Sequence, residues 1–519
     1  MKLSKSVMFG AAACLLSTSA SAQAAGDLLA LSQYNYSFST ARSAALGGAF
    51  TSLGADLSSM SINPAGLGMY MSSDFGISPS LTWNNMQSTY LGTKSDYSRT
   101  RFTLGNLGMA FNLYQGSGTL TSFTLGVGYS KLADFNTTSA AYGQGIDKSI
   151  TDVLAEYMNG VPLSSLGHPD NDPYQPFRRA DVGLWGGILA YQTGILDPMS
   201  DAQDNKQYTV ANNLATGSRT NPSMRNVNKG SIDEYSISGG FNIQNILYLG
   251  FTIGIQDILY RNDNYYAETY DNNPLPLNGM NYIRSLHLDG TGVNFKFGAV
   301  VRPVENLRIG VAVHTPTLVS INEEYIEWMS ADYKNTARGE LLDSPRSLNE
   351  YDINTPTRLL TGISYTLPGV GLITADYERV WYNRMKLRNM GTENWDFQQT
   401  INNEVSSFYQ PANNFRVGIE ATPAQNFYIR AGYANYGECI ATRDAFNNMS
   451  SINSYENYSA GLGFRFQNMY VDLAYIYTEY KYAPYTMFYY GDPDYVVNPG
   501  NVETKQSRNT ITMSVGVRF

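Results

Sequence analysis

The 519-residue sequence contains little charge, two cysteines and only three histidines, and charged residues make up 15% of it. Two cysteines exclude a disulfide-stapled scaffold. No run of 18 apolar residues occurs, which excludes a helical membrane protein. The formal net charge of -9 argues against nucleic acid as a partner. What the chain does have is 43% apolar residues and 40 tyrosines, and this composition excludes a disordered chain.

The first 22 residues have the parts of a secretory signal peptide. Two lysines precede an apolar stretch at residues 7–16, and residues 20–22 (ASA) form an A-x-A cleavage site. A lipoprotein attached through Cys14 is an alternative. The apolar run continues past that cysteine, which argues against it. Cys439 remains after cleavage, and we expect it to be a packed side chain rather than a reactive thiol.

From about residue 75 onward, the chain falls into short segments in which apolar residues alternate with small or polar ones. In the last segment Ile511, Met513, Val515 and Val517 share one face, and Phe519 ends it. This period of two is typical of β-strands. About fourteen such segments occur, and bacterial outer-membrane barrels have an even number of strands. They begin near residues 75, 104, 119, 235, 247, 292, 307, 358, 372, 414, 427, 457, 469 and 509.

The connections between these segments alternate in length. Tight turns such as 115–118 and 303–306 alternate with long polar excursions, which we expect to be loops. This rhythm is typical of a transmembrane barrel with short periplasmic turns and long extracellular loops, whereas a soluble β-sandwich, the alternative, has no reason to place every long loop at one end. The excursions cover residues 84–101, 134–230, 260–291, 315–357, 381–413, 436–456 and 480–508.

The two faces of the segments also fit a barrel. One face is uniformly apolar, and the other carries small residues with scattered charges, which would be costly in contact with lipid. The charged residues expected in the lumen are Lys296, Arg308, Arg416, Glu420, Arg430, Arg465 and Asp472. We therefore predict an all-β fold: a transmembrane antiparallel β-barrel of about 14 strands over residues 72–519, with 134–230 as its largest loop. Phe519 resembles the terminal aromatic that barrel-assembly machinery recognises.

Residues 23–71 do not alternate, and they are too apolar for a solvated tail. A barrel of fourteen strands has a lumen that its own wall side chains cannot fill. We therefore predict that this segment is an N-terminal hatch, or plug, inside the lumen. Gly47 and Gly48 would allow close approach of its backbone to the wall, next to the apolar Phe50. The alternative is a flexible periplasmic extension.

The segments 41–50 (ARSAALGGAF) and 61–67 (SINPAGL) resemble the hatch of FadL/TodX-type outer-membrane transporters, and 293–317 and 355–378 resemble two barrel hairpins of that family. The resemblance implies a monomeric fourteen-stranded barrel that takes up long-chain fatty acids or other hydrophobic compounds.

The same resemblance implies that Asn63, Pro64 and Ala65 of the hatch abut a kink in the third strand. Gly126 and Gly128 of that strand could relax the β-ladder locally. Alternatively, these two glycines make room for the plug.

Catalysis has little support, so we expect no enzyme and neither a metal nor a cofactor. His287 with Ser285 is the one tempting pair, and a structural role suits it better. His168 precedes Pro169, His314 precedes Thr315 and Pro316, and no Cys/His cluster suggests zinc. Two acidic stretches, 170–172 and 492–494, lack EF-hand spacing and are expected to be solvated loops.

Residues 149–158 are predicted to form a short amphipathic helix. Its Leu154, Tyr157 and Met158, together with Trp185 further along the largest loop, could line an outward groove that captures an apolar ligand. The alternative is that these residues pack the loop onto the barrel rim.

The predicted function is passive uptake of a hydrophobic small molecule through the outer membrane of a bacterium. The ligand would be captured by the outer loops, bound in the lumen, and released by movement of the hatch or of the third strand. Outer-membrane lipids and the ligand are the expected partners. The alternatives are a general porin and a surface adhesin or structural barrel.

Overall fold

The computed structural model describes residues 25–35, 39–166, 172–334, 339–391, 394–441, 451–492 and 495–519. The predicted signal peptide, His168 and the middle of both acidic stretches lie outside these residues. Among the described helices, none has the length and apolar character needed to cross a membrane.

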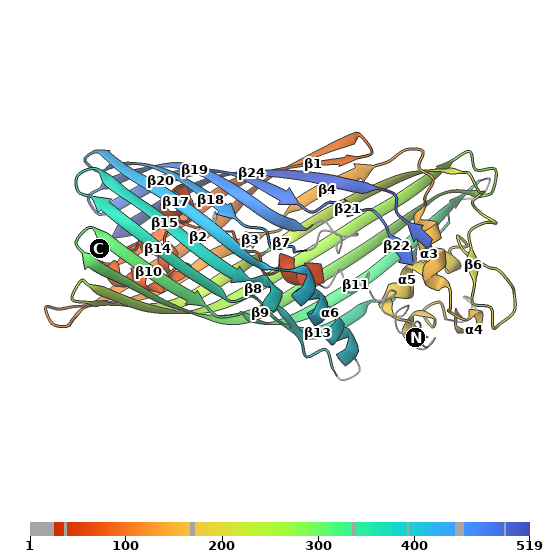
Figure 1. Cartoon of the computed structure of the whole chain (residues 1–519), viewed down its shortest axis with the longest axis horizontal. Coiled ribbons are helices and arrows are strands. Elements are labelled where there is room, and N and C mark those ends of the chain that lie inside the picture. The colour runs from red at the N-terminus through yellow and green to blue at the C-terminus, as the bar shows by residue number, and fades with distance from the viewer. Residues whose placement is uncertain are drawn as a thin grey trace, which may run out of the picture.

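The wall is a closed barrel of fourteen antiparallel strands, as predicted. The first and last strands pair, with Phe75 opposite Val517, and this pairing closes the cylinder seen in Figure 1. The seventh and eighth strands are each interrupted once. The strands are β1 (Asp74–Tyr90), β2 (Thr93–Gln115), β3 (Leu120–Asp134), β7 (Arg219–Ile243), β8 (Leu247–Asp271), β9 (Leu277–Val304), β10 (Leu307–His314) with β11 (Leu318–Tyr333), β13 (Ser347–Asn354) with β14 (Arg358–Leu367), β15 (Gly371–Trp381), β17 (Pro411–Ala424), β18 (Phe427–Tyr436), β19 (Ile452–Phe466), β20 (Met469–Tyr482) and β24 (Asn501–Arg518).

An apolar band surrounds the end of the barrel that has the short turns. On β8, for example, Phe251, Ile253 and Ile255 point outward and are exposed, while the alternating residues face the lumen. Lipid contact accounts for such a band, because a membrane barrel needs only about 9–11 residues per strand to cross the hydrocarbon. Phe519 lies at this end, and it is 62% exposed.

Several predicted loops are in fact strands that continue beyond the band, so their prediction as loops is wrong. Residues 84–101 form a hairpin of β1 and β2 around Leu91 and Gly92, and 260–291 are largely the outer halves of β8 and β9. Most of 315–357 is β11 paired with β13. These outer halves are polar on the outside because water rather than lipid surrounds them, so they lack the apolar face by which strands were recognised.

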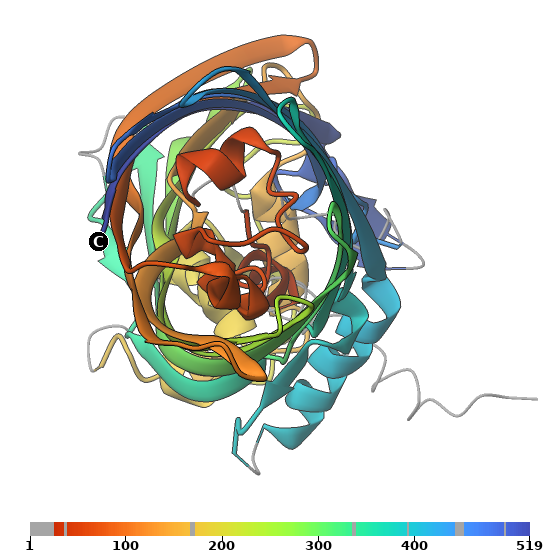
Figure 2. The same ribbon diagram turned by 90° about the vertical axis from the view of Figure 1, so that its left-hand side faces the viewer.

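The N-terminal segment lies inside the barrel, which confirms the predicted plug. In the view along the barrel axis of Figure 2, the red and orange N-terminal chain occupies the interior of the ring. It begins with a helix at residues 25–30 and continues through α2 (Ala41–Ala45), η2 (Leu57–Met60) and η3 (Pro64–Met69). Its described residues are almost all buried.

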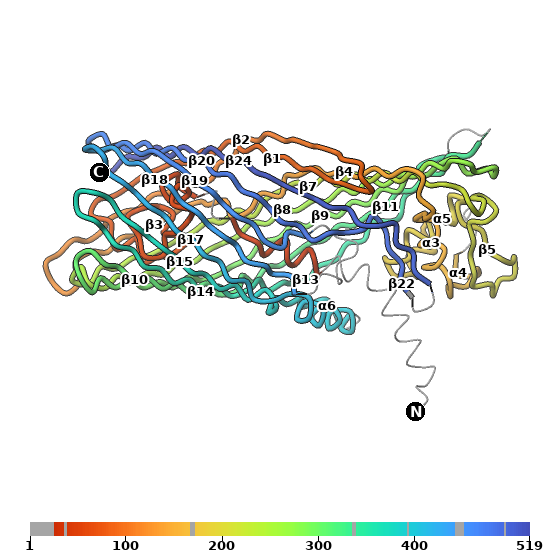
Figure 3. Tube along the Cα trace, turned by 45° about the horizontal axis from the view of Figure 1, so that its top comes forward, coloured from red at the N-terminus to blue at the C-terminus, as the bar shows by residue number. Residues whose placement is uncertain are grey.

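The opposite end of the barrel carries a cap built from the largest loop and the last one (Figures 1 and 3). A further helix, α6 (Trp395–Phe408), lies outside the wall about midway along the barrel. The elements of the cap and of the other loops are β4 (Thr137–Tyr142), α3 (Ile150–Met158), α4 (Leu163–Leu166), η4 (Phe177–Arg179), η5 (Val182–Leu184), α5 (Trp185–Gln192), β5 (Asp197–Pro198), β6 (Tyr208–Thr209), β12 (Leu342–Asp343), η6 (Tyr382–Arg384), β16 (Lys386–Arg388), β21 (Tyr485–Thr486), β22 (Tyr490–Asp492) and β23 (Tyr495–Val497).

Candidate functional site: the hatch, the lumen and the cap

The hatch is tied to the wall by polar contacts at several heights. Thr51 donates from its backbone N and its Oγ1 to Asp376 Oδ2, at 2.8 and 2.6 Å. The guanidinium of Arg42 lies 3.3 Å from Glu420 Oε2. His314 of β10 contacts the carbonyl oxygen of Ile62 at 2.9 Å. Water cannot reach these buried wall groups, so the hatch supplies their hydrogen-bond partners.

Glycines allow hatch and wall to meet backbone to backbone. Gly47 and Gly48 have φ of 67° and 75°, a left-handed conformation that favours glycine. A Cβ placed on Gly47 would lie 3.0 Å from the backbone N of Tyr433, and one placed on Gly432 of the wall would lie 2.2 Å from the backbone N of Gly47. The predicted role of Gly47 and Gly48 in close packing thus has its structural counterpart, and Phe50 is buried beside them.

The Asn-Pro-Ala motif meets the wall at β8 and β9, and η3, which begins with Pro64 and Ala65, also contacts the third strand. Asn63 caps η3 by accepting from the backbone N of Ala65 at 3.1 Å. A Cβ on Gly250 would lie 2.2 Å from the carbonyl carbon of Pro64, and one on Gly298 would lie 1.8 Å from Asn63 Oδ1. Short-range sequence does not specify which wall strand a buried turn meets.

The third strand shows no kink at its two glycines. Gly126 and Gly128 pair in register with β2 and with β7. A Cβ at either position would come within 2.8 or 2.5 Å of the side chain of Met60 in the hatch. The geometry therefore fits the alternative in which these glycines make room for the plug.

The irregularity of β3 lies further along, beyond the apolar band. Its register against β7 shifts between Lys131 and Ala133. Within this bulge the carbonyl oxygen of Leu132 accepts a hydrogen bond from the backbone N of Asn35, at 2.8 Å. A bulge leaves backbone groups unpaired, and here the hatch satisfies one of them.

The lumen beside the hatch contains a network of buried charges. Arg430 lies 2.6 Å from both Glu420 and Asp472. Arg358 and Arg416 lie 3.3 Å from the two oxygens of Glu378. Buried charges are tolerated when they are paired in this way.

The predicted inward orientation is confirmed for five of the seven charged residues, whereas Arg308 and Arg465 are only partly buried. Lys296, Arg416, Glu420, Arg430 and Asp472 are all buried inside the barrel. Lys296 forms its ion pair with Glu234.

Toward the cap, the first residues of the hatch and the surrounding wall form one buried cluster of apolar side chains, which we call the apolar chamber. The N-terminal helix at 25–30 places Leu28 and Leu29 among aliphatic side chains of the wall, and Leu31 follows in the turn after it. Cys439 is buried in the same cluster, as expected, and its Sγ lies 3.3 Å from the carbonyl oxygen of Asn453. The wall residues of this apolar chamber include Leu132, Ile232, Ile258, Leu286, Leu288, Val319, Ile321, Ile353 and Val380.

The predicted helix over 149–158 is α3, and it is part of the core of the cap. Leu154, Met158 and Trp185 are buried, at 4%, 0% and 5% exposure, and Tyr157 packs on Tyr490 with ring centroids 5.7 Å apart. These contacts are those of a loop packed onto the barrel rim. They do not place the four predicted capture residues on an open surface.

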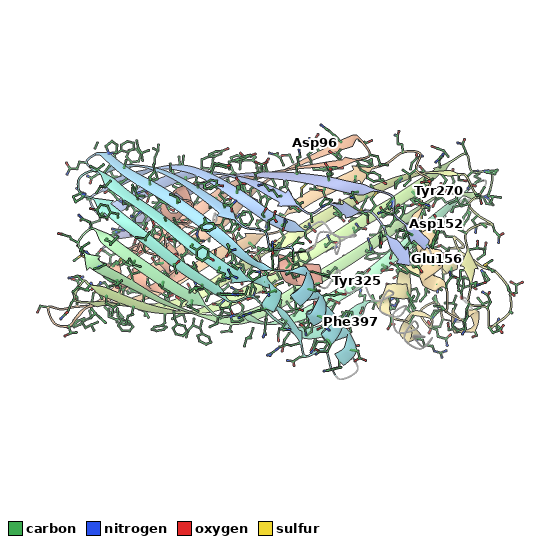
Figure 4. All side chains as sticks on the ribbon, viewed as in Figure 1. Asp96, Asp152, Glu156, Tyr270, Tyr325 and Phe397 are labelled. Carbon is green, nitrogen blue, oxygen red and sulfur yellow. The ribbon has the colours of Figure 1, made fainter. Side chains whose placement is uncertain are left out.

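A buried carboxylate that the sequence did not reveal attaches α3 to the wall. Glu268 of β8 accepts hydrogen bonds from Ser149 Oγ, the backbone N of Ile150, Tyr266 Oη and Tyr270 Oη, at 2.5, 2.8, 2.5 and 2.8 Å. Burial raises the pKa of Glu268, and these hydrogen bonds act against that increase. Figure 4 shows Tyr270 beside α3, at the cap end of the barrel.

A pocket of about 590 Å³ opens on the outer halves of β7, β8, β9 and β11. Arg225 stacks over the ring of Tyr265 there, 4.6 Å from its centroid, and the hydroxyls of Tyr97 and Tyr142 are 3.0 Å apart. Sequence reasoning missed this pocket, because its residues come from segments that were expected to be loops.

Ser285, which was considered with His287 for catalysis, has another hydrogen-bond partner. Ser285 donates to Asp263 Oδ1 at 2.7 Å, so its hydroxyl proton is directed at a carboxylate rather than at His287.

No curated protein and no protein-family model matches the sequence. Solved structures do match. The Pseudomonas putida toluene transporter TodX is 12% identical, with a TM-score of 0.51, over 94% of this chain and 99% of that one. A Pseudomonas aeruginosa FadL homologue is 11% identical, with a TM-score of 0.52, over 93% and 98%.

At this identity the likeness establishes the fold. The chain has the architecture of these FadL/TodX-type channels: a fourteen-stranded barrel with its N-terminal segment in the lumen. The resemblance of the segments 41–50 and 61–67 is thereby confirmed at the level of the fold.

Proposed function

We propose that this protein is a monomeric outer-membrane channel for the passive uptake of hydrophobic small molecules, such as long-chain fatty acids, and that it is not an enzyme. The observation that carries the proposal is the apolar chamber, which lies in a lumen that the hatch otherwise obstructs. A chamber lined by aliphatic side chains binds an apolar ligand by removing it from water.

The described N-terminal helix occupies that chamber. A ligand would therefore have to displace Leu28, Leu29 and Leu31, and would replace their contacts with its own. Binding and movement of the hatch would then be coupled, because the two occupants compete for the same wall. Release would follow through the space left by the hatch or beside the third strand.

A reversible crosslink between hatch and wall tests whether the hatch has to leave the wall during uptake. In a Cys439→Ser background, the pair Thr51→Cys and Asp376→Cys places two thiols where hatch and wall now meet. We expect uptake of radiolabelled oleate or toluene by cells to fall at least about tenfold under oxidation and to recover with reductant, since the disulfide would hold the hatch on the wall. The single variant Thr51→Cys is the matched control. Unchanged uptake with a fully formed disulfide would refute movement of this part of the hatch.

The two rival functions have their own tests. A general porin would show a large steady conductance in planar bilayers, whereas an obstructed lumen predicts closed traces. For a surface adhesin, a strain that lacks the protein would keep normal uptake of the labelled compound. Barrel-assembly machinery, recognised through Phe519, is proposed as the partner during insertion.

A further inference from the structure

One side of the barrel carries a concentration of positive charge directly above the apolar band. On β15 and β17, Tyr377 and Phe415 are the last outward-facing aromatics of the band, with ring centroids 5.3 Å apart. The next outward row is polar: Arg379 Nη1 donates to Asn413 Oδ1 at 3.1 Å. Because β15 ends at Trp381, the chain leaves the wall here at the level where lipid headgroups begin.

The segment that follows turns its cationic residues outward. Arg384, Lys386 and Arg388 are exposed, while the intervening Met385 and Leu387 are buried in the apolar chamber cluster. The alternation arises because β16 extends the sheet by pairing with β13, so successive side chains point to opposite faces.

The position of this strand is fixed from its other side by α6. Asn402 accepts from the backbone N of Leu387 at 2.8 Å and donates to its carbonyl oxygen at 3.0 Å. The helix therefore completes the hydrogen bonds of an edge strand that would otherwise be open. The three cations are held on a fixed backbone rather than on a free loop.

Within the described residues, Arg379, Arg384, Lys386 and Arg388 form no ion pair within 4.0 Å. The carboxylate opposite them in register, Asp352, already accepts hydrogen bonds from Ser320 and Asn389. In a chain of net charge -9, four unpaired cations on one short surface are an exception that points to an anionic partner.

Aromatic side chains accompany the cations. Arg379 and Arg384 each lie 5.8 Å from the ring centroid of Trp381, and Trp395 at the start of α6 is 59% exposed. Tryptophan is enriched where a membrane protein meets the headgroup region. The position of α6 beside the wall, with Phe397 on it, is visible in Figure 4.

We infer that Arg379, Trp381, Arg384, Lys386 and Arg388 form a binding site for the phosphorylated headgroup of an outer-leaflet glycolipid. Guanidinium groups bind phosphate through paired hydrogen bonds, and the ring of Trp381 would lie beside the sugar and the upper acyl chains. The inference depends on the outward orientation of the loops in the proposed function, but not on uptake.

Binding of purified lipid A in maltoside micelles, followed by native mass spectrometry, tests this site. We expect the folded protein to bind lipid A that carries both phosphates at least about tenfold more tightly than dephosphorylated lipid A. The variant Arg384→Gln, Lys386→Gln, Arg388→Gln should lose this preference. The variant Lys94→Gln, Lys206→Gln, Arg219→Gln removes the same charge from exposed positions of the hairpin tip and the cap, and should keep it.

Equal binding by the two triple variants, or equal binding of the two lipids by the unaltered protein, would overturn the site. Competition by inorganic phosphate as strong as that by lipid A would show that a free anion is the ligand, and would also overturn it. If the first variant fails to fold, the unaltered protein still decides, because binding must weaken at least about tenfold between roughly 50 and 500 mM NaCl if cations carry it. Normal uptake by a variant that has lost lipid binding would leave the proposed function standing.

Discussion

Substitution of Glu268 should release the cap from the barrel. The carboxylate accepts four hydrogen bonds, two of them from the start of α3 at Ser149 and Ile150. Each buried donor left unpaired costs about 1–3 kcal/mol, and water entering the vacated site would recover part of the total. We therefore expect Glu268→Ala to lower the opening free energy of α3 by about 3–5 kcal/mol.

Amide hydrogen exchange measures this opening residue by residue. A decrease of that size accelerates exchange over residues 149–158 by at least about a hundredfold, while the strands of the apolar band keep their protection. Glu268→Gln should cost less, about 1–2 kcal/mol, because one acceptor oxygen remains. The matched control is Glu156→Ala on α3 itself, a partly exposed carboxylate that accepts a hydrogen bond from Asn159, and it should change exchange little. Equal exchange in Glu268→Ala and Glu156→Ala would refute the role of Glu268 as the attachment of the cap.

Three further predictions concern the hatch, the lumen and α6. Gly298→Val should force Asn63 off the wall, because even a Cβ there would lie 1.8 Å from Asn63 Oδ1, and planar-bilayer recordings should show openings that Ala299→Val does not cause. Arg430→Met should destabilise the barrel by about 3–5 kcal/mol, since it leaves buried carboxylates unpaired, and a lower unfolding temperature in heat-modifiability gels would show it. Burial raises the pKa of Glu404 to about 7, so the folded form holds a proton that the unfolded form releases near its ordinary pKa. The contribution of Glu404 to the stability of α6 should be complete below that ordinary pKa and should be lost as pH rises through about 7. Proteolysis of the loop at pH 5.5 and at pH 8 measures this loss. Glu404→Gln should remove the difference in proteolysis between the two pH values.

The membrane-spanning halves of the strands were predictable from the sequence. Lipid outside and a lumen inside impose a period of two, and residues such as Phe295 and Val311 on the outer face express it clearly. The presence of a plug was also predictable, because apolar residues without alternation have to be buried somewhere. Both predictions rest on contrasts between water, lipid and protein that act on each residue locally.

The outer halves and the contacts of the hatch were not predictable in the same way. Strand residues such as Asn262 and Asp289 lie beyond the apolar band, where the outer face of the strand is polar, and their composition is that of a loop. The partners of Asn63 and Pro64 are set by how the hatch is seated in the completed barrel, which short motifs do not encode. Leu154 and Trp185 show a third difficulty: an apolar side chain for capture and one for packing have the same sequence signature.

The length of the strands has a consequence for where the entrance lies. Strand β9 has 28 residues, and at about 3.3 Å per residue and a tilt of about 40° it rises roughly 70 Å, of which the hydrocarbon takes only about 25 Å. The barrel therefore extends far beyond the hydrocarbon on the side that carries the cap. For the proposed uptake, an apolar molecule arriving from outside would therefore meet the protein before it reached the bilayer.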